Sequence, residues 1–396
     1  MSADQLFPHP VPPQPVPPRQ ATRQPPLPPR PKRRRRRVVP LVIAALLAYP
    51  VGTYGYALTY PGDASVSVRT VDWLRDIGLG GVVNAVENWW FTRHPPSSAP
   101  PSAGDLPSLG GPAGNGAGPR PRNLPVGPSA AAGAGEWLPG ARSAGGQVAE
   151  YTTFIQPDPA HASVVAGVAW LNQSLVRTQL FSGTKDPGGP GPAAIPAEMR
   201  GSLVAAFNSG FKLKDCNGGY YYLDGTTVAP LHNGMASAVI DDTGRVSVAQ
   251  WGRDATMNPH LTAVRQNLDL VIDHGAPVPG LDLNPAGHWG SASNQFQYTW
   301  RSGLGTDRAG NLLYIGGTGL TLHTLAGAMV QAGIQQGMEL DIHSPMVTFT
   351  SYRPDAPGVG PDKLLPTMPG NLTRYLQADQ RDFFATSLRS RPPTAP

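Results

Sequence analysis

The sequence predicts an α+β fold, in which one strand-rich domain with a few helices follows a transmembrane helix and a disordered linker. Two observations predict the domain. From residue 151 onward, short apolar or alternating runs are separated by turn residues, a pattern typical of β-strands. Only two stretches of this region combine helical periodicity with capping signals, so a doubly wound α/β fold is not expected.

The composition shows that the chain is neither packed throughout nor disordered throughout. Gly and Pro supply 47 and 46 of the 396 residues, close to the level of about 25% at which low-complexity sequence becomes common. Hydrophobic residues nevertheless reach 40%, with 8 Trp and 12 Tyr, which a packed domain must bury. The single cysteine, Cys216, excludes an intramolecular disulfide, and no Cys/His pair has the spacing of a zinc site.

The positive charge is concentrated at the N-terminus. The formal net charge is +5, but residues 1–37 carry nine Lys or Arg against one Asp, which leaves −3 for residues 38–396. The folded part is therefore slightly acidic, and it lacks the basic surface of a nucleic-acid-binding domain. We expect no nucleic-acid partner.

Residues 1–37 are predicted to be a disordered, Pro-rich, basic cytoplasmic tail. They contain twelve prolines and few large apolar side chains, so they cannot bury enough surface to offset the entropy of ordering. A PxxP-like run from Pro25 to Pro29 admits a weak SH3-type partner, and a solvated tail is the alternative. The basic block from Lys32 to Arg37 is explained by membrane topology and attraction to anionic lipid, with nucleic-acid binding as the alternative.

Residues 38–60 are predicted to form a transmembrane helix. They are 23 consecutive uncharged residues, and at about 1.5 Å per residue they span a hydrocarbon core of roughly 30 Å. Tyr54, Tyr56 and Tyr60 gather at one end, as interfacial aromatic residues do. A cleaved signal peptide is the alternative. The preceding cations place the N-terminus in the cytoplasm, so we expect a single-pass protein of the cell membrane with an extracytoplasmic C-terminal domain.

Two further segments precede the domain. Residues 61–94 have apolar residues at helical spacing in two pieces separated by glycines, which predicts a membrane-proximal helical hairpin. Its aromatic side chains, Trp73, Trp89, Trp90 and Phe91, either rest at the lipid headgroups or pack on one another. Residues 95–150 contain 12 Gly, 11 Pro, 11 Ala and 6 Ser, which predicts a linker.

The domain itself is predicted to cover residues 151–376, followed by a C-terminal tail at 377–396. Ten candidate strands have apolar or alternating patterns: 164–171, 175–181, 203–207, 219–223, 236–241, 245–250, 268–272, 312–315, 338–342 and 346–350. One helix is expected at residues 259–266, where Asn258 precedes Pro259. A second is expected at residues 322–332, with Thr321 as N-cap and Gly333 as stop.

Three polar, glycine-rich stretches are candidates for the chemistry. In the first, residues 206–215, Asn208 offers an amide donor and a carbonyl acceptor, Gly210 allows close backbone approach, and Lys212 adds a cation. A plain turn is the alternative. In the second, residues 299–307, the planar fork of Arg301 suits a phosphate or carboxylate, with Ser302 and Thr306 as supporting donors. A surface ion pair is the alternative.

The third stretch, residues 338–345, places Asp341 and His343 two apart on a predicted strand and therefore on one face, with Ser344 beside them. A carboxylate and an imidazole can divide acid and base work. The alternative is a structural carboxylate and a surface histidine. The chain contains no G-x-S-x-G, H-E-x-x-H or EF-hand pattern, so the sequence indicates no metal ligands, and it leaves any cofactor unknown.

Taken together, the three stretches resemble the phosphodiester glycosidase family of the uncovering-enzyme type, especially its bacterial membrane-anchored forms. The chain has A-F-N-S-G-F, W-R-S-G-L-G-T, a helix and E-L-D-I-H-S, where the family pattern runs N-G-G-F, R-T-A-I-G, a helix and L-D-G-G-G-S. The resemblance covers residues 164–350. It differs at Ser209, Ile342 and His343, which stand where the family pattern has glycines.

The resemblance implies hydrolysis of a sugar-1-phosphodiester to a free sugar and a phosphomonoester, here in glycan of the cell envelope. It implies catalytic roles for Asp341 as the carboxylate, Arg301 as the phosphate ligand and Asn208 as a positioning group. Substrate contacts are then expected from Gly210, Lys212, Ser302, Thr306, His343 and Ser344. The alternative is a non-catalytic envelope glycan-binding module on the same fold.

Overall fold

The computed structural model describes residues 42, 48–62, 64–107, 117–189, 191–222, 226–291 and 293–390. The chain separates into two compact units, Met1–Gly52 and Thr53–Pro396, and every element below belongs to the second. The predicted tail at residues 1–37 and much of the predicted span at residues 38–60 lie outside the described residues. No helix within the described ranges is long and apolar enough to cross a membrane.

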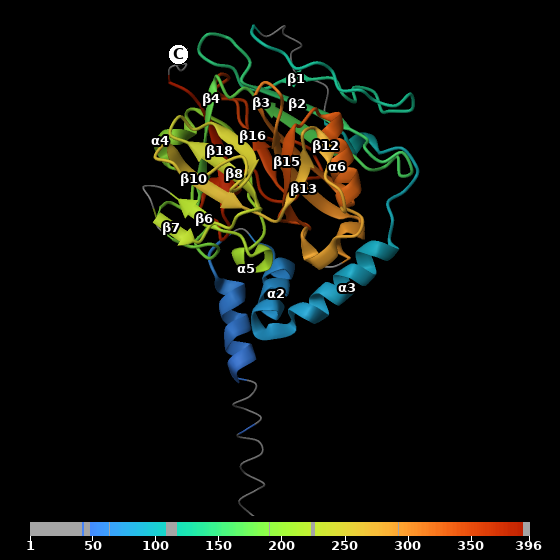
Figure 1. Ribbon diagram of the computed structural model, residues 1–396, viewed down its shortest axis with the longest axis vertical. Helices are drawn as coiled ribbons and strands as arrows, with labels where there is room; N and C mark the ends of the chain where they lie inside the picture. The colour runs from blue at the N-terminus through green and yellow to red at the C-terminus, as the bar shows by residue number, and fades with distance from the viewer. Residues whose placement is uncertain are drawn as a thin grey trace, which may run out of the picture. The chain divides into compact units, whose positions relative to one another are not determined.

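Three antiparallel sheets make up the domain (Figure 1). The largest has eight strands in the order β1-β2-β3-β14-β13-β15-β11-β12. These strands are β1 (Leu138–Pro139), β2 (Glu150–Ile155), β3 (Ala166–Leu171), β11 (Leu270–Asp273), β12 (Ala276–Pro277), β13 (Thr299–Thr306), β14 (Leu312–Leu320) and β15 (Gln336–Ile342). The sheet places the second and third sequence stretches, on β13 and β15, on adjacent strands.

The other two sheets have five strands each. The order β7-β6-β10-β8-β9 joins β6 (Tyr220–Tyr222), β7 (Thr226–Ala229), β8 (Ala236–Asp241), β9 (Val246–Gln250) and β10 (Leu261–Gln266). The order β17-β16-β5-β18-β4 joins β4 (Val176–Phe181), β5 (Leu203–Asn208), β16 (Phe349–Ser351), β17 (Asp362–Lys363) and β18 (Phe383–Leu388). Each of the ten predicted strands overlaps an observed strand, so the strand-rich α+β class is confirmed for the described chain.

Helices are few, and the longest one within residues 151–390 was predicted. Helix α6 (Leu322–Gln331) begins at the N-cap Thr321, whose hydroxyl accepts a hydrogen bond from the Thr324 amide. Its inner face, including Leu325 and Met329, packs on the eight-stranded sheet. Two short helices, α4 (Ala197–Arg200) and α5 (Leu213–Cys216), are followed by single 3₁₀ turns at Pro285–Gly287, Asn294–Phe296 and Arg374–Leu376.

The helix predicted at residues 259–266 is wrong, because this segment is strand β10. It pairs with β6 on one side and β8 on the other, in the middle of its sheet. Asn258 does not cap a helix but accepts a hydrogen bond from the His260 amide in a turn. Residues 263–266 are all buried, as in a central strand, and sheet pairing outweighed the apparent capping signal.

Packed chain extends beyond the predicted domain, residues 151–376, at both ends. Within the supposed linker, Trp137 is 3% exposed and packs with Leu124 in the core beside β3 and β14. At the other end, β18 of the supposed tail lies between β5 and β4. Small residues made the first segment resemble a linker, but Ala and Gly also allow a chain to lie close against a sheet. The folded domain therefore includes residues 117–150 and 377–390.

The core between the first and third sheets is aromatic. Phe207 of β5 stacks against Phe349 of β16 and Phe384 of β18, at ring-centroid distances of 5.5 and 5.4 Å. The ring centroid of Tyr314 in β14 lies 5.0 Å from that of Phe349, and the Tyr314 hydroxyl donates a hydrogen bond to Asn208 Oδ1. This packing fixes the end of β5, from which the first polar stretch begins.

Residues 66–93 form a helical hairpin, as predicted for this part of the chain. Helix α2 (Val66–Leu74) runs into a π-turn (Arg75–Leu79) and then into α3 (Gly80–Arg93). Gly78 makes the bend with φ of +91°, a conformation that side-chain-bearing residues disfavour. Asp72 and Asp76 form ion pairs with Lys212 and Lys214 beside α5, so the hairpin lies against the domain below α5 (Figure 1).

Candidate active site

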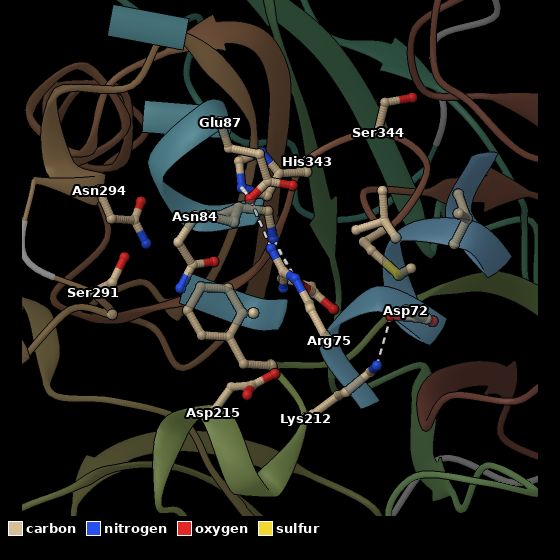
Figure 2. Close-up of a pocket in the computed structure, with 18 of the residues that line it drawn as sticks. Asp72, Arg75, Asn84, Glu87, Lys212, Asp215, Ser291, Asn294, His343 and Ser344 are labelled. Atoms are coloured by element: carbon tan, nitrogen blue, oxygen red, sulfur yellow. Dashed lines mark hydrogen bonds and ion pairs between the residues drawn. The ribbon is translucent and has the colours of Figure 1, made fainter. Parts of the chain in front are cut away.

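A cavity of about 900 Å³ lies between the α2–α3 hairpin and the strand ends of the domain. Its polar lining includes Asp72, Arg75, Asn84 and Glu87 from the hairpin, Lys212 and Asp215 after β5, Asn294 from the 3₁₀ turn before β13, Asp341, His343 and Ser344 around the end of β15, and Arg381 before β18. Figure 2 shows several of them, including Arg75, Lys212 and His343, on segments that are far apart in the sequence. A concave site with several charged groups is the default location for ligand binding.

Asp341 is the carboxyl group most strongly shaped by this cavity. It is 8% exposed at the end of β15. Its Oδ2 lies 2.9 Å from Arg381 Nη2, and its Oδ1 accepts a hydrogen bond of 2.9 Å from the Ile342 amide. Burial raises the pKa of Asp341 to about 6, although the nearby Arg381 acts in the opposite direction. The group therefore changes its charge within the range useful for acid–base chemistry.

Arg381 is the partner that the sequence did not predict. Its Nη2 donates to both Asp341 and the Gly210 carbonyl, each at 2.9 Å, which joins the first and third stretches. Its buried Nε has no hydrogen-bond partner among the described residues. Arg381 lies outside the resemblance and inside the segment predicted to be a tail. The apolar run that forms β18, directly after it, was the signal that this segment belongs to the domain.

Lys212 brings a second cation to the cavity. It is 7% exposed, and its Nζ lies 2.6 Å from Asp72 Oδ1 of the hairpin. Figure 2 shows the two side chains pointing toward each other across the cavity wall. The hairpin also contributes the ion pair of Arg75 and Glu87, at 2.7 Å. Arg75, Asp72 and Glu87 were not among the predicted site residues, because the hairpin had been assigned to the membrane surface.

Asn208 does not line the cavity but supports Asp341 from behind. Its Nδ2 donates to Ser302 Oγ at 3.0 Å, and that hydroxyl donates to the Asp341 carbonyl at 2.8 Å. Asn208 Oδ1 accepts from the Thr348 amide at 3.0 Å and from the Tyr314 hydroxyl at 2.9 Å. Asn208 and Ser302 thus hold the backbone of Asp341 in position. Neither side chain lines the cavity.

Arg301, which was predicted to contact a substrate phosphate, does not line the cavity in this structure. Its side chain is fully buried and ion-paired with the equally buried Glu339. The remaining guanidinium hydrogens go to the Leu320 carbonyl and to Asn294. Thr306, at the other end of β13, pairs with Leu312 and Gln336 and does not line the cavity.

His343 and Ser344 line the cavity as the sequence predicts. The His343 ring stacks on Phe91 of α3 at 5.2 Å, and its Nδ1 is 2.9 Å from Thr299 Oγ1. Burial is the main cause that lowers the pKa of His343 to about 3, and Arg301 and Arg75 act in the same direction. The imidazole is therefore neutral near pH 7. In the described part of the chain, no group of three or more His, Cys, Asp or Glu is arranged to hold a metal ion.

Comparison with known proteins gives similarities of fold only. No family model and no curated protein matches the chain. The catalytic domain of a zebrafish N-acetylglucosamine-1-phosphodiester α-N-acetylglucosaminidase, auto-inhibited by its pro-peptide, is similar at 14% identity and a TM-score of 0.41, over 65% of this chain and 88% of that one. A hypothetical protein from Synechocystis is similar at 13% identity and a TM-score of 0.34, over 57% of this chain and 59% of that one.

Proposed function

We propose that this chain is a membrane-anchored, extracytoplasmic hydrolase that cleaves a sugar-1-phosphodiester of cell-envelope glycan, that is, a phosphodiester glycosidase. The observation that carries the proposal is Asp341, a cavity-lining carboxyl with a pKa of about 6 beside the partly buried Arg381. A titrating carboxyl can transfer a proton, and the cations beside it can bind an anionic sugar substrate. The order of the three sequence stretches supports the same reaction.

In the proposed reaction, Asp341 acts in its carboxylate form as a general base. It takes a proton from water while the water oxygen bonds to the anomeric carbon of the sugar. The bond from that carbon to the phosphate oxygen breaks, and its electron pair stays with the phosphate. Glycosidases ordinarily use a second carboxylic acid to protonate the leaving group. A phosphomonoester leaves as a stable anion, so a single carboxylate suffices.

The phosphate is proposed to bind between Arg381 and Lys212. Both side chains line the cavity with Asp341. Both are largely shielded from solvent, so a charge-assisted hydrogen bond from either one to a phosphate would be strong. Lys212 is paired with Asp72, so a bound phosphate would exchange one anionic partner for another. This role is assigned to Arg381 in place of Arg301, which is buried away from the cavity.

The membrane anchor and the extracytoplasmic location are parts of the same proposal. They rest on the 23 uncharged residues at positions 38–60 and on the cationic block before them. If the stretch spans the bilayer, the full-length chain stays in the membrane pellet after extraction with alkaline carbonate. Release into the supernatant would contradict the anchor without bearing on the hydrolase activity.

The activity is tested with the full-length chain in detergent and a sugar-1-phosphodiester such as UDP-N-acetylglucosamine, with free sugar as the readout. We expect release, and we expect Asp341→Asn to lower kcat by about 10²- to 10⁴-fold, the usual contribution of a general base. Asp215→Asn, which removes an exposed carboxyl from the same cavity, is the matched control and should retain most of the activity.

If folded wild-type protein releases no sugar from several sugar-1-phosphodiesters, the proposal of hydrolysis is contradicted. Saturable binding of the same compounds without turnover would then support the envelope glycan-binding module instead. Binding that weakens in Lys212→Met would place the ligand in the same cavity.

A further inference from the structure

Helix α3 exposes an apolar stripe to solvent. Its side chains Val82, Val86, Trp89 and Trp90 are 61, 59, 52 and 49% exposed, and Ala85 beside them is exposed as well. Positions 82, 85, 86, 89 and 90 recur at intervals of three and four, so they lie along one face of the helix. We call these five residues the α3 stripe.

The opposite face of α3 lies toward the domain and is mixed, because polar side chains stand there beside the buried Val83 and beside Phe91, which stacks on His343. Asn84 and Glu87 line the cavity (Figure 2), and Asn88 is hydrogen-bonded to Gln297. An ordinary surface helix buries its apolar face and exposes its polar face. Here four large apolar side chains are exposed while Asn84 and Glu87 are partly covered, which indicates that the outer face contacts something apolar.

The chemistry of the stripe favours a lipid surface. At its C-terminal end, the Arg93 guanidinium lies 5.9 Å from the centre of the Trp89 ring, and His94 stacks on Trp90 at 3.8 Å. Tryptophan beside cationic and polar groups is typical of the membrane–water interface, where one part of the ring contacts hydrocarbon and its N–H contacts headgroups.

The position of the stripe in the chain favours the same occupant. Tyr60 ends the uncharged stretch, and α2 begins at Val66, so the five residues between them let the two ends lie at most about 20 Å apart. The ring of Trp73 in α2 also lies 4.8 Å from that of Tyr54. A hairpin tethered this closely cannot move far from a bilayer that holds the stretch.

We propose that the α3 stripe docks on the headgroup region of the membrane that anchors the chain; the proposal rests on the anchor of the proposed function. Because the opposite face of α3 lines the cavity, docking would bring the cavity wall to the membrane surface. A second copy of the chain and a protein partner are the other occupants that the test distinguishes.

The test uses the full-length chain reconstituted in phosphatidylcholine vesicles, with and without brominated acyl chains, which quench the fluorescence of tryptophans that contact lipid. We expect brominated lipid to quench part of the wild-type emission. The variant Trp89→Phe/Trp90→Phe should lose most of that quenching. Trp251→Phe, which removes a tryptophan that is 6% exposed in the core, is the matched control and should keep it.

Two further measurements make each outcome decisive. Thermal unfolding checks that the variants remain folded, which conservative changes at exposed positions should allow. Equal quenching in the double variant and the control would overturn the proposal, whether or not the chain resists carbonate extraction. Cross-linked dimers that the double variant abolishes, without any lipid quenching, would assign the stripe to a second copy and would also overturn it.

Discussion

The carboxyl group of Asp341 has a higher pKa than an ordinary surface aspartate. Burial raises this pKa from 3.8 to about 6, and Arg381 opposes the rise without cancelling it. The pKa of Glu87 is also raised by burial, but Glu87 is ion-paired with Arg75 of the same hairpin. Among these carboxyl groups, Asp341 combines a fixed orientation at a strand end with access to the cavity.

The proposed general base predicts a pH dependence. If the carboxylate form of Asp341 is active, kcat/KM should rise about tenfold per pH unit below about pH 6 and level off above it. The measurement is kcat/KM for sugar release between pH 4 and pH 8. A rate that falls as the pH rises through 6 would contradict the base role and assign Asp341 to acid catalysis.

Stability gives an independent check on the same pKa. Because the folded state holds the proton more tightly than the unfolded chain, Asp341 lowers the free energy of unfolding as pH rises from 3.8 toward 6. Relative to wild type, Asp341→Asn should therefore gain stability between pH 4 and pH 7 in urea unfolding. A difference that does not change with pH would mean that the pKa is not raised.

The pair of Lys212 and Asp72 predicts opposite effects of two substitutions on substrate affinity. Lys212→Met removes a cation that a phosphate would contact, and we expect KM to rise about tenfold, since a charged hydrogen bond contributes about 1.5 kcal/mol or more. Asp72→Asn frees Lys212 from its anionic partner, so KM should fall. Steady-state kinetics of both variants checks this, and a rise of KM in both would contradict phosphate binding at Lys212.

The sequence predicted some of the residues that line the cavity and missed others. Asp341, Lys212, His343 and Ser344 line the cavity as expected, but Arg301 does not. The pairing register of β13 with β15 shifts between Arg301 and Gly303, and such a shift changes which side chains share a face. Without strand pairing, the alternation along a single strand could not reveal that Arg301 faces Glu339.

Elements were predicted best where the signal is local. Helix α6 has its own N-cap, its own stop and a continuous apolar face, so its sequence suffices to define it. Strand β10 depends on two neighbours for its pairing, and its Asn-Pro start resembled a helix cap. Strand β13 contains two glycines and was not predicted as a strand, and its pairing with β15 is long-range.

The ion pair that joins β13 to β15 predicts a structural role for Arg301. Arg301→Met leaves the buried Glu339 without its partner, and we expect a loss of about 3 to 5 kcal/mol in the free energy of unfolding. The double variant Arg301→Met/Glu339→Leu should recover most of it, because no buried charge remains. Denaturant unfolding measures both. A stable Arg301→Met protein with a raised KM would instead restore the original phosphate role.

The cavity is assembled from segments near both ends of the folded chain. The hairpin at residues 66–93 supplies one wall, and Arg381, near the C-terminal end of the described residues, supplies the partner of Asp341. The sequence resemblance covers only residues 164–350, so neither contribution lay within its reach. Composition alone cannot separate a loose Gly/Ala/Pro segment from one that packs on a sheet.

The position of β18 predicts how the chain responds to truncation. A chain that ends at Leu376 loses β18 and leaves β4 and β5 without their shared partner, while the pocket for Phe383 and Phe384 is emptied. We expect it to aggregate or to lack a cooperative thermal transition. A chain that ends at Ser390 keeps every described strand and should melt like the full-length protein. A folded chain ending at Leu376 would contradict the central place of β18.

The most direct test of the proposed function is to determine which bond is broken. Hydrolysis of a sugar-1-phosphodiester by the full-length chain is carried out in water enriched in ¹⁸O, and both products are analysed by mass spectrometry. Attack at the anomeric carbon predicts that ¹⁸O enters the released sugar and not the phosphomonoester. Label found in the phosphomonoester would mean cleavage between phosphorus and oxygen, and it would contradict the assignment of this cavity as a glycosidase site.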